Sequence, residues 1–246
     1  MSTLSRITGV IATLFLLGTM AGCSNSTDPV TEDDPFLVVD PQTGQTTIDI
    51  DDLLEQIRVR TPVADSFPQV LVCQEIEESC AEMLQELQTS YQQFLPPAIA
   101  AMIDEEENQA AAMRAVLEVY GVQEALPENT RGVYKDNEVD SAWDNALGDD
   151  GRITDDDEAW QAVFRVFEFA VAEYRELGDS TLTNDARLVT NVFKAANENS
   201  LMALLLVWPP DLPLPEPEYL IDEDLEELRK KAQAASFNDC RWCTPP

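Results

Sequence analysis

Apolar side chains return every three or four residues over much of this chain, which is the repeat of an amphipathic helix. The repeat runs from Ile76 to Phe94, Ile99 to Tyr120, Trp160 to Leu177 and Leu188 to Ala203. The link between the second and third of these segments is longer than the others. Four helices with one longer link predict an all-α fold, a four-helix bundle.

Capping and breaking residues indicate where these helices begin and end. Thr154 followed by three aspartates is typical of a helix N-terminus, because the helix dipole favours negative charge there. Gly121 is expected to stop the second helix. Pro96-Pro97 should close the first helix, and Pro209-Pro210 the last. The bundle is therefore predicted to occupy residues 67–208.

Polar side chains interrupt the apolar rows of these helices. Glu106 and Gln109 follow the same rhythm as Met102 and Met113, so we expect both to point inward. A buried carboxylate is costly unless it is paired, hydrogen-bonded or bound to metal. The other helices carry comparable interruptions at Glu77, Glu168, Asn199 and Ser200.

Three short motifs accompany these interruptions. Residues 117–121 are Leu-Glu-Val-Tyr-Gly, residues 129–134 are Asn-Thr-Arg-Gly-Val-Tyr, and residues 199–203 are Asn-Ser-Leu-Met-Ala. Over residues 75–206 this order resembles the ferritin-like family catalogued as domain of unknown function 2202. The resemblance implies a ferritin-like four-helix bundle, in which inward Glu side chains and Glu-x-x-His pairs hold two metal ions.

The chain departs from this family at the histidines. Glu106 stands at a metal-binding Glu of the family, but Gln109 stands at its His and Ser200 at the last family His. The sequence contains no histidine at all. Gln and Ser are neutral oxygen donors and poor substitutes for imidazole at an iron centre. The remaining candidate metal ligands are Glu77 or Glu78, Glu106 and Glu168.

Three interpretations of this polar row remain open. We favour a degenerate bundle whose inherited polar groups now hydrogen-bond one another, without metal. The second is an all-oxygen site for a hard cation such as Mn²⁺, Mg²⁺ or Ca²⁺, and the third is redox di-iron chemistry. Without histidine no Ser/His/Asp or Cys/His nucleophile can form, and no glycine-rich phosphate loop is present. The sequence therefore favours a protein that is not an enzyme and has no cofactor, with a divalent metal as the alternative.

Residues 1–22 resemble a bacterial lipoprotein signal peptide. An arginine precedes a short apolar core from Val10 to Leu17, and residues 20–23 are Met-Ala-Gly-Cys, similar to a lipobox. The apolar run is too short to span a bilayer as an uncleaved anchor. The resemblance implies lipidation at Cys23. Because Ser24 rather than Asp follows, it also implies sorting to the outer membrane, facing the periplasm.

Residues 23–66 and 209–246 extend the chain on both sides of the predicted bundle. The first begins as an acidic tether and continues into short extended segments and a helix through Leu53, Leu54 and Ile57. We interpret it as a short irregular appendage on the bundle. Residues 209–246 are predicted to form a proline-rich strap, a short helix and a Cys-x-x-Cys tail.

Acidic residues outnumber basic residues by 47 to 15, which gives a formal net charge of −32. A surface of this sign repels nucleic acid and anionic lipid faces. We interpret it as a solvated surface that keeps an exported protein soluble. The alternative is a surface for cationic partners or divalent ions. The expected contacts are the membrane, through the N-terminal lipid, and an unidentified protein or divalent-cation partner.

Four cysteines remain besides Cys23, and an even number in an exported chain indicates disulfides. Cys73 and Cys80 stand roughly 10 Å apart if their segment is wholly helical, which is too far for a direct bond. We therefore favour cross-links from this pair to Cys240 and Cys243. The alternatives are a redox pair at the C-terminal Cys-x-x-Cys and a four-thiolate zinc site.

Together these expectations describe a lipid-anchored envelope protein whose degenerate ferritin-like bundle has a structural or binding role without di-iron chemistry. The alternative is a metal-binding ferritin-like protein, for storage or oxidation, with an all-carboxylate site. That alternative requires Glu77, Glu106 and Glu168 to lie together, since bridging metals sit about 3.5–4 Å apart.

Overall fold

A computed structural model describes residues 35–39, 46–60, 62, 64–95, 97–122, 141–142, 146, 153–179 and 182–238. The predictions for the signal peptide, Cys23, the tether, the motif at 129–134, Cys240 and Cys243 lie outside the described residues.

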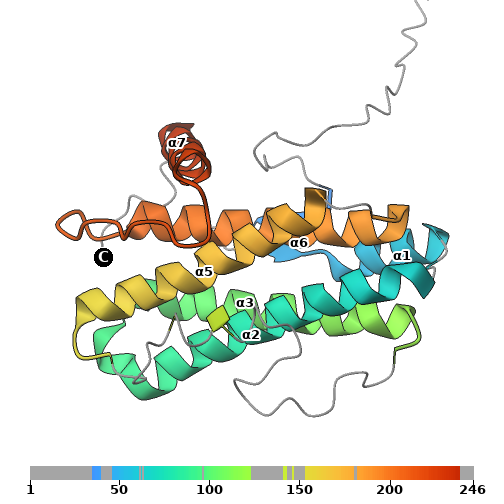
Figure 1. Cartoon of the computed structure of the whole chain (residues 1–246), viewed down its shortest axis with the longest axis horizontal. Helices are drawn as coiled ribbons and strands as arrows, with labels where there is room; N and C mark the ends of the chain where they lie inside the picture. Colours follow the sequence, from blue (N-terminus) through green and yellow to red (C-terminus); the bar gives the residue numbers. More distant parts are fainter. Residues whose placement is uncertain are drawn as a thin grey trace, which may run out of the picture.

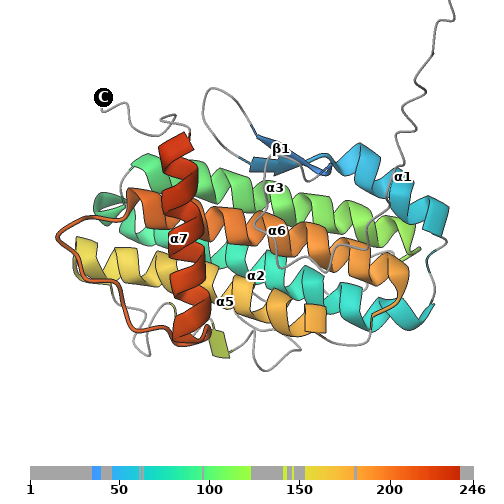
Figure 2. The ribbon, with the colours of Figure 1, turned by 90° about the horizontal axis from the view of Figure 1, so that it is seen from above.

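Four long helices pack side by side as a bundle (Figures 1 and 2). They are α2 (Phe67–Tyr91), α3 (Pro97–Val119), α5 (Asp156–Asp179) and α6 (Asn184–Val207). Helix α2 contacts both α3 and α5, and α6 makes its most extensive contact with α5. The predicted all-α four-helix bundle is therefore confirmed.

The direction of each helix follows from how the chain connects them. Helices α3 and α5 run in the same direction along the bundle, whereas α2 and α6 run in the opposite one (Figure 1). The turn η2 (Gln92–Phe94) leads from α2 toward α3 at one end of the bundle. The end of α3 and the start of α5 therefore lie at opposite ends of the bundle (Figure 1).

Local hydrogen bonds set the end of α3 and the start of α5. Gly121 takes a left-handed conformation, with φ at +73°, and the N–H of Val122 donates to a carbonyl of the last helical turn at 3.1 Å. At the start of α5, Asp155 Oδ1 accepts from the N–H of Glu158 at 2.9 Å. Asp155, rather than the predicted Thr154, therefore caps this helix.

The N-terminal appendage is a β-hairpin followed by a helix. Strands β1 (Leu37–Val39) and β2 (Thr46–Ile48) pair antiparallel. Helix α1 (Ile50–Arg60) and the turn η1 (Ala64–Ser66) follow. Both β2 and α1 contact α3 and α6, so the appendage covers these two helices. The short extended segments and short helix predicted here are present.

Residues 208–221, which we call the strap, lead from the end of α6 into α7 (Asp222–Asn238). Helix α7 crosses over α6 (Figure 2). At the start of the strap, the ring of Trp208 makes edge contacts with Trp160 and Phe164. The buried face of α7 consists of Leu225, Leu228 and Ala232. The expected strap and C-terminal helix are therefore present.

Large aromatic side chains fill much of the core. The fully buried ones are Phe164, Phe167, Phe169, Tyr174 and Phe193. All five come from α5 and α6, and Tyr174 stacks on Phe193 between these two helices. No described helix is both long enough and apolar enough to cross a membrane.

Candidate polar site in the bundle core

Polar side chains from three helices meet inside the bundle, and each is at most 1% exposed. We call these five residues the core polar cluster. Helix α2 contributes Glu77, α3 contributes Glu106 and Gln109, and α6 contributes Asn197 and Ser200. The inward orientation predicted for Glu106 and Gln109 is confirmed.

Hydrogen bonds run through the core polar cluster from α2 to α3 by way of α6. The Asn197 amide donates to Glu77 Oε1 at 2.9 Å and to Gln109 Oε1 at 3.3 Å. The Gln109 amide in turn donates to Glu106 Oε1 at 3.1 Å and to Ser200 Oγ at 3.4 Å. Gln109 and Ser200, which stand where the resemblance implied histidines, are therefore part of one hydrogen-bond network.

Three oxygen atoms of the cluster accept no hydrogen bond from any described residue. They are Glu77 Oε2, Glu106 Oε2 and Asn197 Oδ1, and their side chains are fully buried. Unsatisfied buried polar atoms are uncommon in folded proteins and call for an explanation. All three atoms are acceptors, so the cluster is short of donors. A proton on a carboxyl group, a bound water or a cation would compensate these three oxygens.

Burial controls the protonation of the two carboxyl groups. It raises the pKa of Glu77 to about 7, while the nearby Tyr174 hydroxyl, which donates to the Cys73 carbonyl at 3.4 Å, and the hydrogen bond from Asn197 lower it. Burial also raises the pKa of Glu106 well above the usual range of a carboxyl, and the charges of Glu77 and Glu105 raise it further. Near neutral pH the cluster therefore retains a proton, which supplies one of the missing donors.

Of the two glutamates proposed on α2, Glu77 alone belongs to the cluster. Glu78 is partly exposed, and its Oε1 accepts from the Gln74 amide at 2.8 Å. The same oxygen pairs with Arg114 of α3 at 3.5 Å. Glu78 therefore faces the outer side of the α2–α3 contact and is not a candidate ligand.

Glu168 is fully buried but lies outside the core polar cluster. Its Oε1 accepts the backbone N–H groups of three consecutive strap residues, 218–220, at 2.6, 2.9 and 3.1 Å. Its Oε2 pairs with Arg165 at 2.9 Å. The prediction that Glu168 joins the other candidate carboxyls is wrong, because both of its oxygens are engaged by the strap and by Arg165.

The side chains of the cluster do not fit a di-iron centre. Among the described residues no three His, Cys, Asp or Glu side chains form a group that could hold a metal ion, and the sequence has no histidine. A ferritin-like di-iron site needs carboxylates from all four helices together with two histidines. The carboxyl, amide and hydroxyl oxygens present here are instead the ligands of hard cations.

The sequence alone did not identify Asn197, which links α2 to α3. The apolar rhythm placed Asn199 on the seam of α6, but Asn199 is only half-buried. The spacing does carry a signal. Asn197 follows the buried Phe193 by four residues and precedes Ser200 by three, which places all three on one helix face.

A further buried carboxyl, Glu105, holds the N-terminal hairpin against α3. Its Oε1 accepts the backbone N–H of Thr46 at 3.2 Å. Burial raises the pKa of Glu105 to about 8, against the hydrogen bond from Thr46 that lowers it. Helical periodicity could not predict this residue, because Glu105 faces the appendage and not the bundle interior.

The two cysteines of α2 are free, buried thiols. Cys73 Sγ lies 3.9 Å from Thr190 Oγ1, and Cys80 Sγ lies 3.9 Å from the carbonyl oxygen of Val166. Burial raises the pKa of Cys73 to about 12, which disfavours the reactive thiolate. The predicted cross-links from Cys73 and Cys80 to Cys240 and Cys243 are therefore wrong, because α2 turns both thiols toward α5 and α6. The four-thiolate zinc site and the C-terminal redox pair stay predictions, because Cys240 and Cys243 lie outside the described residues.

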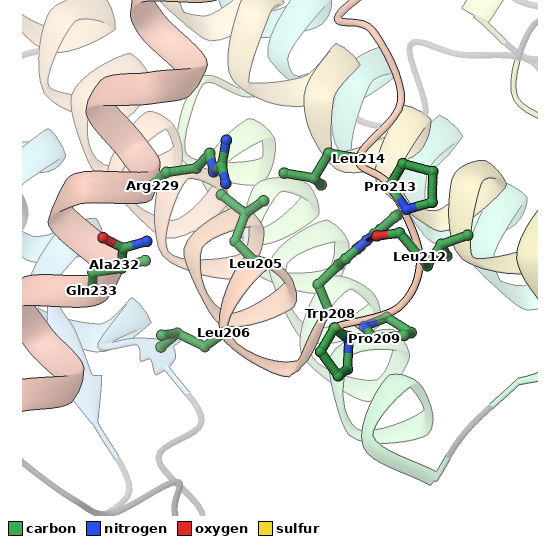
Figure 3. A pocket seen from close by; sticks show the side chains of 11 residues that line it. Leu205, Leu206, Trp208, Pro209, Leu212, Pro213, Leu214, Arg229, Ala232 and Gln233 are labelled. Atoms are coloured by element: carbon green, nitrogen blue, oxygen red, sulfur yellow. Dashed lines mark hydrogen bonds between the residues drawn. The ribbon is translucent and has the colours of Figure 1, made fainter.

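Two grooves lie on either side of the strap. The first has a volume of about 540 Å³ and lies between the end of α6, the strap and α7 (Figure 3). Leucine and proline side chains line most of it, together with Trp208, and Figure 3 shows Arg229 extending toward Leu205 and Leu214. The second groove, of about 450 Å³, lies between α5, the end of the strap and the start of α7.

Comparison with known proteins supports the fold assignment. No protein-family model matches the chain, and no curated protein matches it. The fold is similar to the crystal structure of a hypothetical protein from Methanococcus jannaschii DSM 2661, with a TM-score of 0.58 and 14% sequence identity. The similarity covers 69% of this chain and 95% of the other. At this identity the likeness concerns the helical fold alone.

Proposed function

We propose that this protein is a lipid-anchored protein of the bacterial envelope, whose ferritin-like bundle has a structural or binding role without di-iron chemistry. The anchor rests on the signal features of residues 1–23. The ferritin-like origin rests on the motifs at 117–121, 129–134 and 199–203. The observation that carries the loss of di-iron chemistry is the position of Glu168, whose carboxylate binds the strap instead of joining the cluster.

The hydrogen bonds of the cluster support the same proposal. Gln109 and Ser200 stand where the family has histidines, and the Gln109 amide donates both to Ser200 and to Glu106. These side chains therefore replace metal ligation with direct contacts between helices. A return to metal binding through Glu168 would require the strap to release three backbone N–H groups.

A hard divalent cation held in the core polar cluster is the second candidate function. The unpartnered oxygens Glu77 Oε2, Glu106 Oε2 and Asn197 Oδ1 favour it, since carboxylate and amide oxygens are the ligands that Mg²⁺ and Ca²⁺ take in proteins. In this case the protein would store a cation, or use a bound Mn²⁺ for oxidation.

Elemental metal analysis of the purified protein separates the two functions. We compare the wild type with Glu106→Gln and with Glu55→Gln, an exposed control on α1. The first proposal expects no stoichiometric metal in any of the three proteins. A stoichiometric metal that is lost in Glu106→Gln but kept in the control would overturn it and establish the second.

The anchor is tested separately by mass spectrometry of the N-terminal peptide. We expect an acyl-modified Cys23 as the first residue of the mature chain, and a protein that sediments with membranes. A Cys23→Ser variant should carry no acyl modification. Recovery of the wild-type chain with residues 1–22 still attached and an unmodified Cys23 would contradict the anchor.

A further inference from the structure

We propose that the groove between α5 and the start of α7 binds a basic, partly apolar peptide segment of a partner protein. Residues of α5, the end of the strap and the start of α7 line the groove, and its volume of about 450 Å³ is within the usual range of ligand sites. The proposal rests on the binding role proposed above and names its partner. It uses residues outside the core polar cluster.

The floor of this groove is apolar. Phe169 and Tyr219 meet edge-on, with their ring centres 5.4 Å apart, and Leu220 lines the groove beside them. At its edge Ile221 is 62% exposed, although it is a large aliphatic side chain. Phe169 and Leu220 are already buried, so the apolar surface that a partner side chain would remove from water belongs to Ile221 and the half-buried Tyr219, and its removal favours binding.

Acidic side chains surround the apolar floor. They come from α5, the strap and α7: Glu173, Glu176, Glu218 and Asp224. The guanidinium of Arg175 also lines the groove, but it is already paired with Glu198 at 2.9 Å and with Asp224 at 2.8 Å. Glu218 is likewise paired with Arg165 at 3.3 Å. Four lining carboxylates against one lining guanidinium still leave a net negative rim around an apolar centre, which is complementary to lysine or arginine next to an aliphatic residue.

The arrangement of the carboxylates favours an extended cationic segment over a metal ion. Among the described residues no three acidic side chains converge as metal ligands would. The carboxylates are instead distributed around the floor on three separate elements. Several positive side chains of one peptide can face these separated carboxylates at the same time, whereas a single small ion cannot contact them all.

The wall formed by the strap is fixed before any partner binds. Glu168 accepts the N–H groups of residues 218–220. Arg165 donates to the Glu216 carbonyl at 2.8 Å and pairs with Glu218 at 3.3 Å. A preformed wall lowers the entropy that binding would otherwise lose in ordering the strap. The buried carboxylate of Glu168 thus acts as a positioning group for this surface.

The test measures binding of three acetylated, fluorescently labelled pentapeptide amides to the full chain by anisotropy. The probes are Lys-Leu-Lys-Leu-Lys, Lys-Ser-Lys-Ser-Lys and Glu-Leu-Glu-Leu-Glu. We expect the first probe to bind, the second to bind about tenfold more weakly because it lacks aliphatic groups, and the third not to bind. Binding of the first probe should weaken as salt is added.

Matched variants locate the site. Glu176→Gln should lower the affinity for the first probe about three- to fivefold, and Ile221→Ser should lower it about tenfold. Both residues are exposed, so circular dichroism should show an unchanged fold. Glu55→Gln removes the same charge on α1 and should leave affinity unchanged.

Two outcomes would overturn the proposal. One is equal affinity for the Leu and Ser probes together with equal losses in Glu176→Gln and Glu55→Gln, which would indicate attraction to the overall negative charge alone. The other is no binding of the Leu probe at millimolar concentration. Either result leaves the metal analysis of the core polar cluster unaffected, so the two proposals fail independently.

Discussion

Glu168 and the core polar cluster are both buried, yet their carboxyl groups are compensated in different ways. Glu168 receives three backbone N–H groups and a guanidinium, so both of its oxygens have partners. Glu77 and Glu106 each have one oxygen with a partner and one without among the described residues. The two sites thus show two ways to compensate a buried carboxyl group: charged and backbone donors, or a retained proton.

Among single replacements, that of Glu168 should have the largest effect on stability. In Glu168→Ala the guanidinium of Arg165 and the N–H groups of residues 218–220 lose their shared partner. We expect the free energy of unfolding in urea to fall by about 3–5 kcal/mol, and proteases to cut the strap sooner. Glu168→Gln keeps one acceptor oxygen and should lose less. A loss below about 1 kcal/mol in the alanine variant would contradict the role assigned to Glu168.

A pH titration of stability tests the protonated carboxyls. The folded-state pKa is raised from 4.5 to about 7 for Glu77 and to about 8 for Glu105. Between pH 4.5 and these raised pKa values the folded protein binds more protons than the unfolded chain, so the free energy of unfolding falls as pH rises. The two shifts together correspond to a loss on the order of 7 kcal/mol between pH 4.5 and pH 8, and the loss from these groups should level off near pH 9.

Urea unfolding at fixed high salt measures this loss while screening surface repulsion. Glu105→Gln is the matched variant, because it removes the ionisation and keeps an acceptor for the Thr46 N–H. Its stability should decline less between pH 7 and pH 8 than that of the wild type. Stability that rises across the whole window would show that these carboxyls are ionised in the folded protein.

Glu106→Gln should stabilise the protein at pH 8. The amide adds donors to a cluster that is short of them. It also cannot ionise, so its burial does not cost the desolvation of a charge. We expect a gain of about 1–2 kcal/mol in unfolding free energy. Glu78→Gln, which alters a partly exposed pair with Arg114 on the same helix pair, should change stability by less than about 1 kcal/mol. A clear loss in Glu106→Gln would mean that the cluster needs a carboxylate at this position.

Reducing agents should have the smallest effect. Cys73 and Cys80 are free, so a reductant should shift the melting temperature very little. A cross-link from α2 to the C-terminal tail would close a long loop and contribute about 4–5 kcal/mol. Peptide mapping after alkylation should find Cys73 and Cys80 labelled only once the protein is unfolded. Either thiol recovered in a disulfide would contradict the buried positions.

The apolar rhythm predicted the helices and the inward side of α3 because both depend on contacts within the bundle. It could not predict which residues Glu168 contacts. Glu168 stands at the border of the apolar face of α5, where a side chain can face the core or a later segment of the chain. The partner of Glu168 is more than fifty residues away in the strap, and local spacing carries no information about that contact. Glu105 was missed for a similar reason, because its partner Thr46 lies in the appendage.

The bundle consists of two helical hairpins, α2–α3 and α5–α6, that are separate in the sequence. Glu77, Glu106 and Gln109 belong to the first hairpin, and Asn197 and Ser200 to the second. Contacts within a hairpin are local and form early, whereas contacts between hairpins await docking. Breaking the hydrogen bonds that Asn197 makes should therefore hasten unfolding more than it slows folding. The polar interior would then determine how long the native state lasts, and not how quickly it forms.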